Sequence, residues 1–151
     1  MINWKNLIIS ILIPIGFGIL GSLISDFNSL DAVNKPFFMP PMIVFPIVWT
    51  VLYILMGVSS YLVFESNDLD RFSALKIYFI QLVINSLWSF FFFTLNWFLF
   101  SFVLVLIILV LVVIMTLKFY NINKISGYLQ IPYMIWLSFA SILSLSVYLL
   151  N

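Results

Sequence analysis

The sequence predicts an all-α integral membrane protein, a bundle of five transmembrane helices that forms one domain over residues 1–151. Hydrophobic residues make up 65% of the chain and charged residues only 7%, and the mean hydropathy is +1.25. A soluble domain has roughly 25% charged residues, so this chain has too few charges to cover a water-exposed surface. Long charge-free stretches also recur along the chain, and together with the composition and the hydropathy they predict membrane-spanning helices.

Five of these stretches approach the length of about 20 apolar residues that a helix needs to cross a bilayer. They cover residues 7–25, 42–64, 77–95, 97–117 and 125–150. The first is longer than the apolar region of a signal peptide and lacks a small-residue cleavage site, which favours a retained helix. Little more than Asn96 separates the third stretch from the fourth, so these two are expected to form a tight helical hairpin.

Basic residues predict the orientation, because cytoplasmic loops of membrane proteins carry an excess of Lys and Arg. With five spans, one side of the membrane receives five of the six cations: Lys5, Arg71, Lys76, Lys118 and Lys124. The other side receives only Lys35, in the loop 26–41. We therefore expect a protein of the bacterial cytoplasmic membrane, with its N-terminus in the cytoplasm and the loop 26–41 facing outward.

Several function classes are excluded or disfavoured by composition. The chain has neither cysteine nor histidine, which removes thiolate and imidazole nucleophiles and bases and the usual zinc ligands. A net charge of +1 gives no basic stripe for nucleic acid. The acidic residues all lie at helix ends or in loops, whereas ion-coupled pumps place carboxylates inside the membrane. They are Asp26, Asp31, Glu65, Asp68 and Asp70.

Polar and aromatic side chains align on single faces of three predicted helices. The aligned residues are Trp49, Tyr53, Gly57 and Ser60; Gln81, Asn85, Trp88 and Phe92; and Tyr133, Trp136, Ala140 and Ser144. A rise of 1.5 Å per residue brings Trp49, Asn85 and Ala140 to the same outer-half level. From spacing alone, these residues are compatible with a pocket and equally with packing.

The first and fourth stretches have a different character. In the first, small residues and a proline recur every fourth position at Ser10, Pro14, Gly18 and Ser22, a spacing typical of close helix contacts. The fourth stretch has no polar side chain over residues 103–115. We expect it to face lipid or another subunit.

The segment 34–41 is the most distinctive loop. Its three prolines prevent a continuous helix, and its apolar side chains Phe37, Phe38 and Met39 should be covered rather than left in water. We therefore expect the loop to fold onto the bundle as a lid over the outer half. The candidate lid residues are Lys35, Pro36, Phe38, Pro40 and Pro41.

Four blocks of sequence resemble the tryptophan-rich sensory proteins, relatives of the mitochondrial translocator protein (peripheral benzodiazepine receptor). The blocks are KPFFMPP at 35–41, FPIVWTVLYILMG at 45–57, QLVINSLWSFFFF at 81–93 and PYMIWLSFA at 132–140. The resemblance implies a five-helix bundle, often a homodimer, whose pocket lies under the first loop. It also implies binding of porphyrins, of benzodiazepine-type drugs and, in animal members, of cholesterol.

Carried over by motif, the ligand-binding residues are Trp49, Asn85, Trp88, Trp136 and Ala140, and Tyr53 joins them one turn from Trp49. Two positions depart from the family pattern. Phe38 stands where the first loop commonly has tryptophan, which removes an indole N–H, and Ser144 stands where the family commonly has asparagine.

Three hypotheses follow from the resemblance. In the first, the protein is a membrane receptor or sensor for porphyrins (protoporphyrin and haem-like tetrapyrroles) and other flat lipophilic ligands. In the second, it is an enzyme that degrades protoporphyrin in light, with Trp49 and Trp136 as catalytic residues. In the third, it transports tetrapyrroles or lipids. No cofactor or metal is expected beyond porphyrin as ligand or substrate, and the expected partners are that ligand, membrane lipid and a second copy of the chain.

Overall fold

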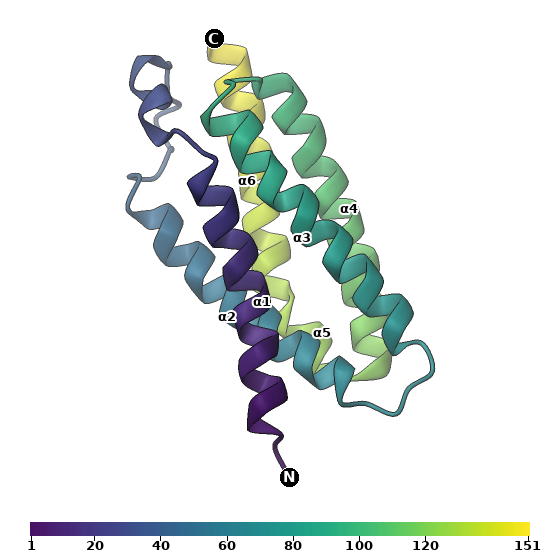
Figure 1. Ribbon diagram of the computed structural model, residues 1–151. Coiled ribbons are helices and arrows are strands. Elements are labelled where there is room, and N and C mark those ends of the chain that lie inside the picture. Colours follow the sequence, from purple (N-terminus) through teal and green to yellow (C-terminus); the bar gives the residue numbers. More distant parts are fainter.

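The computed structural model describes all residues from Met1 to Asn151 as a bundle of long helices without strands (Figure 1). Five helical segments are long and apolar enough to cross a membrane, which confirms the predicted fold class. The elements are α1 (Trp4–Leu23), η1 (Phe27–Ala32), α2 (Val44–Phe64), α3 (Arg71–Phe93), α4 (Phe98–Ile122), α5 (Lys124–Leu129) and α6 (Ile131–Leu150).

The connections alternate between the two ends of the bundle. The N-terminus, the α2–α3 loop and α5 lie at one end, and the loop 24–43, the α3–α4 turn and the C-terminus lie at the other (Figure 1). We call these the N-terminal end and the first-loop end. The α3–α4 turn is tight, and Asn96 has a φ of 53° there, a left-handed conformation that asparagine tolerates better than most residues.

Helices α3 and α4 extend past the expected stretches. α3 begins at Arg71 rather than at residue 77, and α4 ends at Ile122 rather than at residue 117. A charge-free run stops at the first lysine or arginine, but a helix can continue while these long side chains reach toward water. The Arg71 guanidinium donates to the carbonyl oxygen of Phe64 at 3.3 Å, and this contact joins the start of α3 to the end of α2.

The last expected stretch, 125–150, is divided at Gln130 into α5 and α6. Pro132 has no N–H to donate to the carbonyl oxygen one turn earlier, so a continuous helix is interrupted there, although proline is well suited to a first turn. Asn123 caps α5 by accepting a hydrogen bond from the Ser126 N–H at 3.2 Å. The chain therefore turns back into the membrane through a short helix at the N-terminal end.

Close packing of α1 on α2 depends on Gly57. A Cβ atom at this position would lie 2.4 Å from the Ile11 Cα and 2.8 Å from the Ser10 carbonyl oxygen. On α3, the predicted face Gln81, Asn85, Trp88 and Phe92 is buried. The smallest residues of α1 and α2 thus let three helices meet around a common interior.

Helix α4 is not simply a lipid-facing helix, as its apolar sequence suggested. It packs against both α3 and α6, and Val105, Ile108 and Val112 on its inner face are buried. Its outer face carries exposed aliphatic side chains such as Val103 and Val110. Periodicity could not separate the two faces, because both are apolar.

The first loop folds onto the bundle. The Asn151 side chain accepts from the Asn34 N–H and donates to the Asn34 carbonyl oxygen, each at 2.9 Å. The Asp26 N–H donates to the Thr94 hydroxyl at 2.9 Å. These contacts join the loop to the C-terminus and to the α3–α4 turn, so the loop is held near its start and at its middle.

The expectation that the loop's apolar side chains are all covered is wrong for Phe37. Its ring is fully exposed, whereas Pro36 is buried and Phe38 and Met39 are partly buried. Phe38 packs edge-on against Phe139 of α6, with ring centroids 6.3 Å apart. Phe37 and Phe38 are the central residues of a turn that is closed by a hydrogen bond from the Met39 N–H to the Pro36 carbonyl oxygen at 3.0 Å, and this turn places Phe38 against the bundle and leaves Phe37 outside.

Candidate functional site

A cavity of about 650 Å³ lies between α1, α2, α3 and the first loop. Its size is typical of small-molecule sites, which span about 300–1,000 Å³. No charged side chain lines it. Among its lining residues are Gly18, Ser22, Phe27, Phe45, Trp49, Tyr53 and Phe93. We call it the first-loop cavity.

Two predicted ligand-binding residues, Trp49 and Tyr53, line this cavity directly. They are one turn apart on α2, and their rings stack with centroids 5.4 Å apart and an interplanar angle of 28°. Trp49 also meets Tyr133 of α6 edge-on at 6.0 Å. Because each ring is supported from behind, the pair presents an ordered aromatic surface to the cavity.

Asn85 does not line the cavity but supports a residue that does. It is buried on α3, and its Nδ2 donates to the Tyr53 hydroxyl oxygen at 3.3 Å. The hydroxyl oxygen is thereby satisfied as an acceptor while its proton remains available to donate. Asn85 is therefore connected to the cavity through Tyr53.

Trp88 and Trp136 lie behind two phenylalanines. Trp136 meets Phe45 edge-on at 5.8 Å, and Trp88 meets Phe93 in the same way at 5.9 Å. Phe45 and Phe93 are themselves 6.3 Å apart. These two rings line the first-loop cavity, and neither tryptophan does.

Ala140 and the candidate lid residues do not line the cavity either. Ala140 is buried in the core of α6. The residues of the first loop that line the cavity are Phe27, Met42 and Ile43, which lie on both sides of the proline-rich segment. Lys35, Pro36, Phe38, Pro40 and Pro41 instead form the part of the loop whose Phe38 contacts α6.

Sequence reasoning missed the roles of Phe45 and Phe93. Both stand at the edge of a block that carries the family resemblance, but neither belongs to an aligned face considered as a pocket. Gly18 and Ser22 were assigned to packing alone. Gly18 does pack against Tyr53, since a Cβ atom there would lie 2.3 Å from the tyrosine ring, and both residues also line the cavity.

Polar atoms around the site fall into paired and unpaired groups. The Tyr133 hydroxyl donates to Gln81 Oε1 at 2.7 Å. The Trp88 indole N–H and the Ser144 hydroxyl are buried without a hydrogen-bond partner. No group of three or more acidic side chains is placed to hold a metal ion.

Five helices long and apolar enough to span a membrane, three of which line an aromatic cavity, define an integral membrane protein of the helical-bundle class. The model of the TspO/MBR family matches residues 10–149, and the chain belongs to this family. Family membership supports a membrane sensor-type or receptor-type role.

Three relatives are similar over most of their length. The tryptophan-rich protein TspO of Archaeoglobus fulgidus is 34% identical over 99% of both chains. Protein CrtK of Rhodobacter capsulatus is 35% identical, over 89% of this chain and 85% of its own. The tryptophan-rich sensory protein of Cereibacter sphaeroides is 31% identical, over 87% of this chain and 82% of its own. Porphyrin binding, homodimer formation and the orientation of the termini stay predictions.

Proposed function

We propose that this protein is a membrane receptor or sensor that binds porphyrins and similarly flat lipophilic molecules in the first-loop cavity. The observation that carries the proposal is the stacked pair Trp49 and Tyr53 on the wall of a cavity that has no charged lining residue. Aromatic faces pack well against flat π-systems. A broad macrocycle can bury more apolar area against such a wall than a flexible chain can.

One polar contact would orient the ligand. With Asn85 donating to its oxygen, the Tyr53 hydroxyl can donate its proton to a carboxylate or carbonyl oxygen. A hydrogen bond made in an apolar site is strong and directional. Lys35 is the only cation at the first-loop end and is exposed, so it can neutralise a propionate that projects from the cavity.

The rings of Phe45 and Phe93 would decide how deeply the ligand enters. Rotation of these side chains would extend the cavity toward Trp88 and Trp136, which contact them. The Trp88 N–H has no partner and would then be available to the ligand. All of the predicted ligand-binding residues except Ala140 would then act on the ligand directly or through one intervening side chain.

The test is a titration of the purified protein with protoporphyrin, followed by tryptophan fluorescence. The variants are Trp49→Phe, Tyr53→Phe and Trp136→Phe. Trp97→Phe is the matched control, because Trp97 is exposed beside the α3–α4 turn at the same end of the bundle. Wild type and control should show saturable quenching with equal affinity. Trp49→Phe and Tyr53→Phe should bind roughly three- to tenfold more weakly, the factor expected from one aromatic contact or hydrogen bond.

Trp136→Phe should weaken protoporphyrin binding less than Trp49→Phe does, since Phe45 lies between Trp136 and the cavity. Unsaturable quenching that is identical in all five proteins would mean partitioning into detergent, and the proposal would then be wrong.

A further inference from the structure

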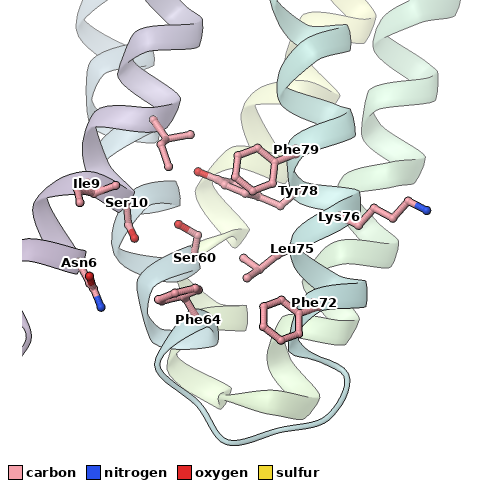
Figure 2. A pocket seen from close by; sticks show the side chains of 11 residues that line it. Asn6, Ile9, Ser10, Ser60, Phe64, Phe72, Leu75, Lys76, Tyr78 and Phe79 are labelled. Atoms are coloured by element: carbon pink, nitrogen blue, oxygen red, sulfur yellow. The ribbon is translucent and has the colours of Figure 1, made fainter.

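A second cavity, of about 540 Å³, lies at the N-terminal end of the bundle between α1, α2 and α3. Figure 2 shows its lining side chains, which come from all three helices. They include Asn6, Ser60, Lys76, Tyr78 and Phe79. We call it the N-terminal cavity. It shares no lining residue with the first-loop cavity.

The cavity exists because α1 and α3 meet at one level and diverge below it (Figure 1). They meet at Gly21, where a Cβ atom would lie 3.3 Å from the Ser86 Cα. The Ser86 hydroxyl donates to the Phe17 carbonyl oxygen of α1 at 2.9 Å. Toward the N-terminal end, the large side chains of Tyr78 and Phe79 take the place of Ser86 on α3. The two helices are therefore held apart beside the lipid.

Two buried hydroxyl groups point into this space (Figure 2). Tyr78 is only 1% exposed, and its hydroxyl has no hydrogen-bond partner. The Ser60 hydroxyl uses its proton to bond the Gly57 carbonyl oxygen at 3.0 Å. Tyr78 thus offers a donor that a pure hydrocarbon chain would leave unsatisfied, and buried polar groups are rarely left so. The Ser60 hydroxyl oxygen lies beside the Tyr78 hydroxyl but forms no well-aligned hydrogen bond with it, so a ligand oxygen that enters the cavity can accept the Tyr78 proton.

The depth of the hydroxyl groups fits the glycerol-ester level of a bilayer leaflet. Tyr78 is seven residues from the start of α3 and Ser60 is four residues from the end of α2, which places them about 6–10 Å inside the helix ends. The polar headgroup region adds roughly 5–8 Å on each side of the hydrocarbon core. An ester carbonyl can reach this level while its headgroup stays at the surface.

The charges at this end favour an anionic headgroup. Five of the six cations lie there, and Lys76 is the only charged residue that lines the cavity. Of the acids at this end, Glu65 accepts a hydrogen bond from Asn6 Nδ2 at 2.6 Å, and Asp68 and Asp70 lie in the exposed α2–α3 loop. Basic residues near a membrane surface attract anionic lipid.

We propose that the N-terminal cavity is a binding site for an anionic phospholipid of the adjacent leaflet. One acyl chain lies between α1 and α3, and an ester carbonyl oxygen accepts the Tyr78 hydroxyl proton. The phosphate stays at the surface, and Lys76, whose ammonium group points away from Tyr78 in Figure 2, turns its flexible side chain toward it. This site is independent of porphyrin binding. It would tie the stability of the bundle to the lipid composition of the membrane.

The test measures lipids retained by the purified protein in native mass spectrometry, with phosphatidylglycerol and phosphatidylcholine of identical acyl chains added in turn. The wild type should retain one phosphatidylglycerol in preference to phosphatidylcholine. Tyr78→Phe and Lys76→Gln should each lower the affinity roughly three- to tenfold, the factor expected for one hydrogen bond or ion pair. Lys118→Gln is the matched control, because Lys118 lies at the same end and donates to Ser73 outside the cavity.

Two outcomes would overturn the proposal. If phosphatidylcholine binds as well as phosphatidylglycerol and Tyr78→Phe changes nothing, the lipids only surround the protein. If Lys118→Gln lowers retention as much as Lys76→Gln, the effect is one of overall charge. Protoporphyrin titration of Tyr78→Phe should match the wild type, which shows that the variant is folded and separates this test from that of the proposed function.

Discussion

The two cavities lie at opposite ends of the same three helices but differ in how their hydroxyl groups are satisfied. At the first-loop end, Tyr53 is paired with Asn85, and behind it Tyr133 is paired with Gln81. At the N-terminal end, Tyr78 is as deeply buried as Tyr133, but its hydroxyl has no hydrogen-bond partner. Around the first-loop cavity the tyrosine hydroxyl groups are paired with protein side chains, whereas in the N-terminal cavity the Tyr78 hydroxyl is left as a donor for a ligand.

This difference indicates what each cavity can bind. A wall of supported rings with a fixed hydrogen bond is preorganised for a rigid, flat molecule, because little entropy is lost in ordering the site. A gap between diverging helices with one free donor instead fits a flexible chain that carries an acceptor oxygen. Both cavities depend on α1, which approaches α2 at Gly57 and α3 at Gly21.

The largest effect is expected for Gly57→Ala, which should disturb both regions at once. Its Cβ would meet backbone atoms of Ser10 and Ile11, so α1 must move away from α2. We expect a loss of stability of at least about 1–3 kcal/mol, measured as a lower thermal midpoint in detergent. Gly16→Ala is the control, because a Cβ there meets nothing within 4 Å. Equal midpoints for the two variants would contradict this account of the helix contact.

Tyr133→Phe and Tyr78→Phe compare the two hydroxyl groups directly. Removal of the Tyr133 hydroxyl leaves Gln81 Oε1 buried without its donor, which should cost about 1–3 kcal/mol. Removal of the Tyr78 hydroxyl breaks no hydrogen bond, so stability in lipid-free detergent should stay within about 0.5 kcal/mol of the wild type. Chemical or thermal denaturation of both variants measures the difference. A reversed order would mean that the pairing pattern is wrong.

Gly18→Ala should weaken the first-loop site while leaving the fold intact. The new Cβ would overlap the ring of Tyr53 rather than backbone, and a side chain can move where backbone cannot. Displacement of this ring breaks the hydrogen bond from Asn85. We expect protoporphyrin affinity to fall roughly three- to tenfold, with lipid retention at the N-terminal cavity unchanged. Gly16→Ala again serves as the control, and a variant that binds protoporphyrin normally would show that Tyr53 is not needed there.

The smallest effect is expected for Asn151→Ala, which frees the middle of the first loop from the C-terminus. Asn151 makes two hydrogen bonds with the Asn34 backbone, both exposed to solvent, and exposed bonds contribute little to stability. Protoporphyrin should therefore dissociate about two- to fivefold faster without a change in thermal midpoint. Stopped-flow displacement measures the rate, and Asn67→Ala in the exposed loop at the opposite end is the matched control. An unchanged rate would mean that the loop does not control release.

The fold class and the helix faces that turn inward could be predicted from the amino-acid order alone. Five apolar stretches require five spans, because unpaired backbone groups are not tolerated in lipid. The aligned residues Gln81, Asn85 and Trp88 could only share one side of α3. The break at Gln130 could also have been predicted from Pro132, which has no N–H group to donate. The stretch 125–150 was defined by its apolar residues alone, and this criterion takes no account of backbone hydrogen bonds.

Which of these residues reach a cavity depends on how the helices pack, and the sequence pattern does not contain that information. Helical spacing places Trp49, Trp88 and Trp136 on aligned faces of their helices, yet it cannot tell whether other rings come between them and a cavity. Phe45 and Phe93 do so. Likewise, the sequence pattern identifies Tyr78 only as an aromatic residue of α3. The structure shows that its hydroxyl is buried without a hydrogen-bond partner, where α1 diverges from α3. Periodicity reports the direction of a side chain along its own helix, whereas free space and hydrogen-bond partners depend on where neighbouring helices lie.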